Sequence, residues 1–303
     1  MEDKCKQGIS CILCKDKAVA HLYQIESYEL LKCKECGFVF TVPRPSNEEL
    51  RSLYKQDYYS EKQGTYGYNV NYVKAVYIRK SEFSKILRII NKHSVRDGNL
   101  LDIGCAHGFF LDIARSNGWK TWGVDISPDA VRFAKRKLGL NIFEGTLEQA
   151  SYPSKFFDVI TMLNFIEHCI DPLSIIFEVN RILKIGGLAA ILTPDIESKL
   201  AIKKAQNWNQ IKPPEHLNYF SRNTIRKLLE ERGFQIKKIE VAGGLGIVTK
   251  ARKAAFPTDK ILSWYGNYLW LLKGISQYIA KVLKVGDMIL VVARKKKDIQ
   301  TGC

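Results

Sequence analysis

The sequence lacks several features that would assign its class at once. It has no long apolar run: the longest uncharged apolar stretch, residues 261–272, is well short of the roughly 20 residues of a membrane-spanning helix. Residues 1–10 contain no secretory signal, and 8 cysteines are too few for a disulfide framework in 303 residues. We therefore expect a cytoplasmic protein with one large α/β core, a smaller appendage and no transmembrane segment.

Negative charge is also scarce, and the imbalance is uneven along the chain. The formal net charge is +16, and residues 201–303 contain 20 Lys or Arg against 7 Asp or Glu. A basic surface of this kind suits an anionic partner. The alternative, a well-solvated surface with a lysine-rich tail, is about equally favoured. Both interpretations stay open from composition alone.

From residue 99 onward, short apolar strands alternate with helical segments. We expect helices at 109–117, after Ser127, between 144 and 157, at 172–183 and after Ser221. The predicted strands are 99–103, 120–125, 141–144, 157–163, 188–193, 234–241 and 287–293. This order predicts an α/β fold with a Rossmann-like, doubly wound, mostly parallel sheet and helices on both faces.

The chain divides into three regions by composition. Residues 1–45 carry paired cysteines, and residues 46–95 read as a helical lid or linker in which Tyr58 and Tyr59 either cover a ligand or pack in a core. Residues 96–303 form the large domain, with a helical, aromatic insertion at about 245–285 before the last strand. The absence of internal repeats excludes a solenoid.

A glycine-bearing turn follows the first strand of the large domain. Asp102, Gly104 and Gly108 lead directly into a helix, and Asp125 ends the next strand. Glycines allow a close backbone approach, free amides lie at the helix start, and a carboxylate at the second strand accepts hydrogen bonds from ribose. The phosphate-binding pattern G-x-G-x-x-G is missing, which disfavours a pyrophosphate cofactor such as NAD.

Five segments extend this pattern in order. They are LLDIGCAHGFFL, WGVDISPDAV, FFDVI, IEHCIDP and RILKIGGLAAI, and together they resemble the successive motifs of class I S-adenosylmethionine-dependent methyltransferases. The resemblance implies that Asp102, Gly104, Ala106 and Gly108 line the methionine end of the cofactor. It also implies that Asp125 binds the ribose and that Ile126, Leu147 and Asn164 border the adenine. Ala106 departs from the family pattern, which has glycine there.

Two cysteine pairs precede this domain. Cys11 and Cys14 form one C-x2-C knuckle, and Cys33 and Cys36 form another after 18 intervening residues, a spacing that suits a structural, four-thiolate zinc site. Cys5 is a rival ligand. Residues 32–59 also resemble the front of a methyltransferase subfamily that carries a zinc ribbon and often serves sugar biosynthesis.

Two histidines are candidates for the catalytic base. His216 lies in PPEHLNYF after the fifth strand, and His168 follows the fourth strand, both at the carboxyl edge where open α/β sheets bind ligands. A histidine can take a proton near neutral pH. The alternative is that His216 only pins its loop, and that His168 is a scaffold or cofactor-side residue.

The leading hypothesis is an enzyme that transfers a methyl group from S-adenosylmethionine to a small-molecule acceptor, by default to oxygen. Nucleotide-linked or lipid-linked sugars and quinone precursors are candidate acceptors. An RNA methyltransferase is the alternative, and nucleic acid is the less favoured partner because no base-stacking module is present. The insertion containing Trp264 and Trp270 suits either a peripheral membrane contact or, preferably, a helical cap or homodimer partner.

Overall fold

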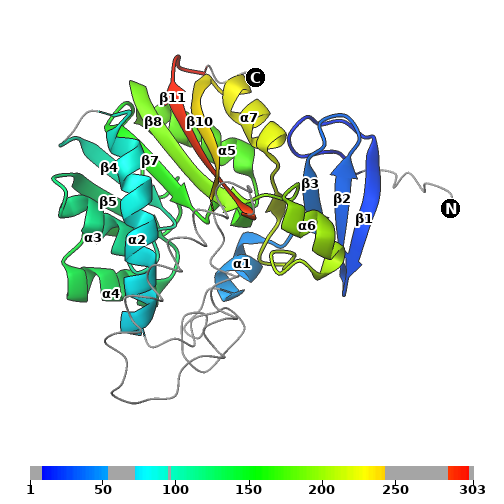
Figure 1. Ribbon diagram of the computed structural model, residues 1–303, viewed down its shortest axis with the longest axis horizontal. Helices are drawn as coiled ribbons and strands as arrows, with labels where there is room; N and C mark the ends of the chain where they lie inside the picture. Colours follow the sequence, from blue (N-terminus) through cyan, green and yellow to red (C-terminus); the bar gives the residue numbers. More distant parts are fainter. Residues whose placement is uncertain (1–8, 54–71, 95–96, 243–285, 300–303) are drawn as a thin grey trace, which may run out of the picture.

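The computed structural model describes residues 9–53, 72–94, 97–242 and 286–299, and contains two sheets (Figure 1). The predicted insertion at about 245–285, the lid residues Tyr58 and Tyr59 and the rival ligand Cys5 lie outside the described residues. No helix among the described residues is long and apolar enough to cross a membrane.

The larger sheet has seven strands in the order β10-β11-β8-β7-β4-β5-β6. Strands β4 to β8 run parallel, and β11 pairs antiparallel with both β8 and β10. The strands are β4 (Asn99–Ile103), β5 (Lys120–Asp125), β6 (Ile142–Glu144), β7 (Phe157–Leu163), β8 (Leu183–Pro194), β10 (Phe234–Ala242) and β11 (Met288–Lys295). The predicted doubly wound, mostly parallel sheet is confirmed.

Helices cover both faces of this sheet, in agreement with the alternation of apolar positions. One hydrophobic cluster joins the sheet to α2 (Tyr72–Asn91), α3 (Phe109–Arg115) and α4 (Pro128–Leu138). The cluster on the opposite face includes α5 (Pro172–Ile182) and α7 (Arg222–Glu231). Strand residues alternate between the two clusters, as Leu100 and Leu101 do, because successive side chains of a strand point to opposite faces.

Local chemistry explains the helix ends. The Ser127 hydroxyl accepts from the amide of Ala130 at the start of α4, and Gly139 ends that helix with a φ of 61°. One local expectation was wrong: the segment between β6 and β7 contains a hydrogen-bonded turn, in which Thr146 and Gln149 bond each other's backbone amides, instead of a helix. The turn is too short to propagate.

The smaller sheet is antiparallel and combines distant parts of the sequence. It contains β1 (Val19–Ile25), β2 (Tyr28–Cys33), β3 (Val39–Val42) and β9 (Asn218–Tyr219). We call residues 9–45 the N-terminal module. Its core is continuous with that of the large domain, since Phe38 and Phe220 pack with ring centroids 5.1 Å apart.

The remaining elements are short. They are α1 (Asn47–Leu53), the 3-10 turn η1 (Ile166–His168), α6 (Lys199–Lys204) and the 3-10 turn η2 (Ala205–Asn207). Figure 1 shows α6 between the large sheet and the N-terminal module. The turn η1 follows the carboxyl end of β7 and carries one of the candidate histidines.

Candidate functional site

The glycine turn between β4 and α3 has a left-handed backbone at three positions. Gly104, Ala106 and Gly108 have φ values of 70°, 46° and 77°. A Cβ added at Gly104 would come within 2.5 Å of the Phe165 ring. Glycine is therefore required at Gly104 by both conformation and packing, whereas Ala106 carries a side chain in a conformation that disfavours one.

Asp125 connects this turn to the end of β5. Its Oδ2 accepts from the amide of Ala106 at 2.7 Å, and its Oδ1 accepts from the amide of Ser127 at 2.9 Å. The side chain is buried, and burial raises the pKa of Asp125 while the two amide hydrogen bonds oppose the rise. A carboxylate offers about four acceptor positions, so Asp125 retains capacity for ligand hydroxyls.

Asp102 is the second buried carboxyl group at this edge. Its Oδ1 accepts from the hydroxyl of Thr161 on the adjacent strand β7 at 2.6 Å. Burial raises the pKa of Asp102 to about 7, the Thr161 bond lowers it, and the nearby charge of Asp125 adds to the rise. A cationic ligand at this position would favour the ionised carboxylate.

These donors and acceptors fit S-adenosylmethionine. Two carboxylates at the ends of neighbouring strands, Asp102 and Asp125, suit a ligand with an ammonium group, a sulfonium and ribose hydroxyls, and would repel phosphates. The glycine at position 104 allows the left-handed backbone of the turn and the close approach of the Phe165 ring.

The three residues predicted to border the adenine lie in different environments. Gly145 donates to the backbone carbonyl of Asp125 at 2.9 Å, which places the turn containing Leu147 beside Ile126. Leu147 is buried, Ile126 is half-buried and Asn164 is exposed with a φ of 57°. Their contacts with the cofactor stay predictions, as do the roles of the turn residues.

The two candidate histidines lie in direct contact. The rings of His168 and His216 cross edge to face with centroids 4.7 Å apart. Nδ1 of His168 lies 2.9 Å from the carbonyl oxygen of Glu215, and Nδ1 of His216 lies 2.7 Å from that of Gln210. Because a carbonyl oxygen only accepts, Nδ1 carries the hydrogen in each ring and Nε2 carries the lone pair.

Burial keeps both rings neutral. It lowers the pKa of His168 to about 4, with the Glu215 carbonyl opposing the shift. It lowers the pKa of His216 well below the usual value, and the charges of His168 and Lys212 contribute further. A neutral imidazole at pH 7 is the form that accepts a proton.

Glu167 completes a group with the two histidines. One ligand atom of each residue lies within 4.8 Å of the others, and the Glu167 carboxyl accepts from the Thr193 hydroxyl at 2.9 Å. Burial raises the pKa of Glu167 to about 7. Hydrogen bonds at Nδ1 leave Nε2 of both rings with a lone pair, an arrangement that suits a proton acceptor and also a metal ligand. We interpret the group as one that handles protons, and a count of bound metal ions tests this interpretation.

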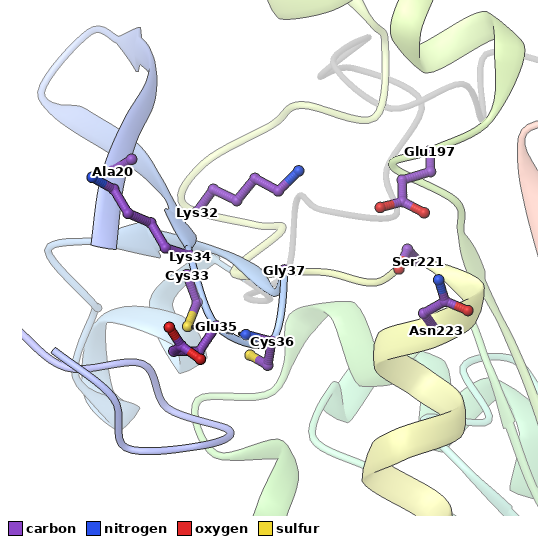
Figure 2. Close-up of a pocket in the computed structure, with 10 residues that line it drawn as sticks. All are labelled: Ala20, Lys32, Cys33, Lys34, Glu35, Cys36, Gly37, Glu197, Ser221 and Asn223. Carbon is purple, nitrogen blue, oxygen red and sulfur yellow. Dashed lines mark hydrogen bonds between the residues drawn. The ribbon is translucent and has the colours of Figure 1, made fainter. Parts of the chain in front are cut away.

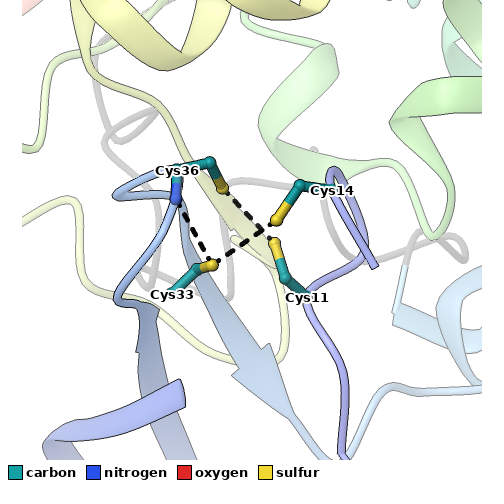
Figure 3. Close-up of side chains that lie close together, drawn as sticks. All are labelled: Cys11, Cys14, Cys33 and Cys36. Carbon is teal, nitrogen blue, oxygen red and sulfur yellow. Dashed lines mark hydrogen bonds between the residues drawn. The ribbon is translucent and has the colours of Figure 1, made fainter. Parts of the chain in front are cut away.

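The four predicted zinc ligands converge on one point, as Figure 3 shows. The sulfur atoms of Cys11 and Cys36 are 3.5 Å apart, as are those of Cys14 and Cys33, and all four lie within 4.8 Å of one another. Thiolates about 2.3 Å from a tetrahedral zinc ion would lie roughly 3.8 Å apart. The donor set and spacing fit zinc, and they exclude disulfide bonds, which need about 2.05 Å.

An open hollow of about 490 Å³ lies where the N-terminal module meets the large domain (Figure 2). Figure 2 shows Lys32 reaching from the module toward the side that carries Glu197 and Ser221. None of the predicted cofactor residues lines this hollow, and neither histidine does. It is therefore separate from the candidate active site.

Sequence reasoning missed three residues that shape the site. Thr161 bonds the carboxylate of Asp102, and Asn218 and Arg44 bond the loops that carry the histidines. Asn218 lies within the PPEHLNYF segment, and Arg44 stands between two prolines, but neither pattern indicates its distant partners.

Comparison with known proteins gives three informative matches. A family model described as a methyltransferase domain matches residues 77–239. The ubiquinone biosynthesis O-methyltransferase of Colwellia psychrerythraea is 25% identical over 188 residues, covering 58% of this chain and 76% of the relative. The 2-methyl-6-phytyl-1,4-hydroquinone methyltransferase 1 of Oryza sativa is 33% identical over 104 residues, covering 29% of this chain and 32% of the relative.

Among solved structures, the chain resembles an S-adenosylmethionine-dependent methyltransferase from Archaeoglobus fulgidus. The TM-score is 0.51 at 22% identity, with 72% of this chain and 94% of that chain covered. At this identity the likeness establishes the fold alone, and it agrees with the doubly wound sheet described above.

Proposed function

The chain belongs to the methyltransferase domain family and is an S-adenosylmethionine-dependent methyltransferase, and from this premise we propose that it methylates a hydroxyl oxygen of a small molecule. The observation that carries the proposal is the pair of neutral histidines after β7 and β8, at the sheet edge where Asp102 and Asp125 also lie; His216 is buried and His168 is half-buried. Phe165 links the two parts, because its ring lies against Gly104 and it precedes His168 by three residues.

In the proposed mechanism, His216 is the base. S-adenosylmethionine, when bound, supplies an electrophilic methyl group on a sulfonium. The acceptor oxygen forms the new bond to carbon as the carbon–sulfur bond breaks, and the hydroxyl proton passes to Nε2 of His216. The carbonyl of Gln210 holds that ring in the required tautomer. His168 packs against the His216 ring and fixes its orientation.

Asp102 and Asp125 hold the cofactor in the proposed mechanism. Asp125 accepts from the ribose hydroxyls, and Asp102 faces the methionine end, where its carboxylate pairs with the ammonium group. Ile126 and Leu147 supply apolar contacts to the adenine, and Asn164 borders it. The protein thereby aligns the methyl group with the acceptor, which is its main contribution to rate in a displacement of this kind.

The names of the relatives support a hydroxylated, small acceptor. One is named as an O-methyltransferase of ubiquinone biosynthesis, and the other is named as a hydroquinone methyltransferase. A phenolic hydroxyl needs only a modest base, because its pKa is near 10 and a neutral histidine can accept its proton as the bond forms. Nucleotide-linked and lipid-linked sugars and RNA are the competing acceptors that the experiment below includes.

We also propose that the N-terminal module binds one structural zinc ion through Cys11, Cys14, Cys33 and Cys36. Four protein ligands leave no open position for a substrate or water. The module is small, so the metal would supply much of its folding free energy.

A panel of acceptors tests the proposed function. The purified protein is incubated with S-adenosylmethionine labelled with ¹³C in the methyl group and, separately, with a catechol, nucleotide-linked sugars, lipid-linked sugars and total RNA. We expect the label on a phenolic oxygen of the catechol, identified by the carbon chemical shift. Label in RNA alone, or on nitrogen or carbon alone, would contradict the proposal.

A further inference from the structure

Arg44 lies at the end of the N-terminal module and contacts both loops that carry the candidate histidines. Its guanidinium donates to the backbone carbonyls of Cys169 (2.9 Å) and Ile170 in one loop and of Leu217 (3.2 Å) in the other, and to Oδ1 of Asn218 (3.0 Å). These partners are between 125 and 174 residues away in the sequence. Burial lowers the pKa of Arg44 to about 10, so the guanidinium stays charged at neutral pH.

The two loops are also bonded to each other. The amide of Leu217 donates to the carbonyl of Glu167 at 2.8 Å, and Nδ2 of Asn218 donates to the carbonyls of Ile166 (3.1 Å) and Cys169 (2.6 Å). Arg44 shares the Cys169 carbonyl with Asn218 and adds bonds to the carbonyls of Ile170 and Leu217. The result is one hydrogen-bonded unit in which His168 and His216 face each other.

Strand β3 supplies a second contact from the module. The hydroxyl of Thr41 donates to the carbonyl of His216 itself at 3.1 Å, and its amide donates to the carbonyl of Leu217 at 3.0 Å. Thr41 is fully buried, and its neighbours on β3 pair with β9 directly after the His216 loop. The knuckle that contains Cys33 and Cys36 precedes this strand, so the cysteine cluster anchors one end of β3 and Arg44 lies beyond the other.

We propose that Arg44 and Thr41 are positioning residues for the His168–His216 pair, and that the N-terminal module acts as a structural part of the acceptor side of the active site. This inference rests on the proposed function in so far as the histidines serve catalysis. The module acts through backbone carbonyls of the two loops and through the side-chain oxygen of Asn218. Metal binding at the cysteines is thereby coupled to the geometry of the base.

The chemistry of arginine explains why this position holds one. Its planar guanidinium presents several N–H donors in fixed directions and can bond several carbonyl groups from two loops together, which a lysine ammonium on a flexible stem does poorly. Displacement of a catalytic group by about 1 Å costs on the order of 10²-fold in rate. Loss of Arg44 should therefore reduce turnover strongly without changing which residues are present at the site.

The test compares Arg44→Ala, Arg44→Lys and Thr41→Val with Arg294→Ala in the full-length, zinc-loaded protein. Arg294 is a matched control, because it also bonds two backbone carbonyls, those of Gly186 and His93, but lies away from the histidines. Affinity for S-adenosylmethionine is measured by calorimetry, and the ring nitrogens of His168 and His216 are observed by ¹⁵N NMR. Neither measurement needs an acceptor. Turnover is measured with the acceptor that the labelling panel identifies.

We expect Arg44→Ala to shift both histidine signals, to lower kcat on the order of 10²-fold and to leave cofactor affinity within about twofold. Arg44→Lys should recover only part of kcat, and Thr41→Val should shift the His216 signal with a smaller loss. Arg294→Ala should change none of these. If Arg44→Ala does not fold, Arg44→Lys and Thr41→Val carry the test alone.

Unchanged histidine signals in folded Arg44 and Thr41 variants would overturn the inference. So would an equal effect of Arg294→Ala, which would indicate a general loss of stability. If the histidine signals shift and turnover does not, the positioning of the rings stands and the proposed catalytic role of the histidines fails. The two proposals are thus separated by different measurements.

Discussion

The cofactor side and the acceptor side of the active site are assembled in different ways. Asp102, the glycine turn and Asp125 belong to adjacent strands β4 and β5 and lie within about one strand-helix-strand unit of the chain. The acceptor side combines Arg44, the His168 loop and the His216 loop, with hydrogen bonds across 125 to 174 residues. The cofactor side can form from a local supersecondary unit, whereas the acceptor side is complete only once the N-terminal module has docked.

The electrostatics of the two sides also differ. On the cofactor side, burial raises the pKa values of Asp102 and Asp125, which favours a cationic ligand that restores the charge. On the acceptor side, burial lowers the pKa values of His168 and His216 and keeps both as neutral bases. The same physical cause favours the uncharged form on both sides, so a cationic ligand is needed to restore the carboxylate charge, while both histidine rings stay neutral at pH 7.

Removal of the metal should have the largest effect on the acceptor side while leaving the cofactor side intact. A structural zinc ion contributes on the order of 10 kcal/mol to the folding of a small metal module. We expect Cys33→Ser to reduce the metal content from about one ion per chain to well below one, to unfold the N-terminal module and to abolish turnover. Affinity for S-adenosylmethionine should persist, because Asp102 and Asp125 lie in the large domain. Elemental analysis, hydrogen exchange and calorimetry measure these effects.

Two results would contradict this expectation. Full metal content after replacement of all four cysteines would exclude the proposed zinc site. Two ions per chain in the unmodified protein would contradict the interpretation of Glu167 and the histidines as a group without metal. Restoration of turnover when zinc is added back to a chelator-treated sample is the positive control.

The next effect in size is confined to the acceptor side. We expect His216→Ala to lower kcat by roughly 10²–10⁴, the usual contribution of a general base, with unchanged cofactor affinity. His21→Ala is the control, because His21 is exposed on β1. Steady-state turnover and calorimetry decide the matter. Wild-type turnover in the His216 variant would remove this residue from the mechanism, and loss of folding would favour its loop-pinning role.

The contrast between the two sides explains how much could be predicted from the sequence. The succession of strands and helices along the chain and the placement of Asp102, Gly104 and Asp125 at one sheet edge follow from short-range periodicity and turn chemistry, which are visible in one chain. The predicted start of β8, residue 188, is too late, because the strand begins at Leu183, which pairs with Phe157. The prediction missed this start because Gly186 and Gly187 interrupt the apolar pattern.

The docking of the N-terminal module could not be predicted in the same way. Pairing of β3 with β9 joins Phe40 to Asn218, and a pairing at this separation leaves no periodic pattern in a single sequence. The cysteine spacing predicted a compact ligand cluster, which the structure contains, but not what its sheet would pack against. Arg44 reads locally as an arginine in a proline-rich turn, and its role depends entirely on tertiary contacts.

On the cofactor side, Asp125→Asn should weaken binding without affecting the histidines. In the wild-type protein, the Asp125 carboxylate accepts hydrogen bonds from the amides of Ala106 and Ser127. The asparagine side chain would place an N–H donor against one of these amides, and charge-assisted bonds worth about 1.5–3 kcal/mol would be lost. We expect a fall in affinity for S-adenosylmethionine of about 10- to 10²-fold by calorimetry. Asp129→Asn, at a partly exposed ion pair with Arg132, is the control and should change nothing. Equal affinity in the Asp125 variant would refute its role.

The pKa of Asp102 predicts a pH dependence of the same binding. Burial raises it to about 7, so the free protein holds a proton on Asp102 at lower pH. A cationic ligand needs the ionised form, and affinity should therefore rise about tenfold per pH unit from about pH 5 and level off near pH 7. Calorimetry at pH 7 and below keeps the amino group of the ligand mostly protonated. The pH dependence of the affinity should vanish in Asp102→Asn. An unchanged pH dependence in this variant would mean that another group causes it.

The smallest effect concerns Ala106, the position where this cofactor turn departs from glycine. Its φ of 46° costs a residue with a Cβ roughly 1–2 kcal/mol, whereas glycine adds about 0.4–1 kcal/mol of unfolded-state entropy to be lost on folding. The strain is the larger quantity, so Ala106→Gly should stabilise the protein by about 0.5–1 kcal/mol and raise Tm by roughly 1–2 °C. Ala205 also has a positive φ, 47° with a ψ of −129°, lies outside the cofactor turn and serves as the control. Thermal unfolding should show a gain for Ala205→Gly as well. Calorimetry should show tighter binding of S-adenosylmethionine for Ala106→Gly alone, because Ala106 donates its amide to Asp125 and Ala205 does not. A loss of stability in both variants would mean that the entropy of the unfolded chain outweighs the strain, and a gain in affinity in both would place its cause outside the cofactor side.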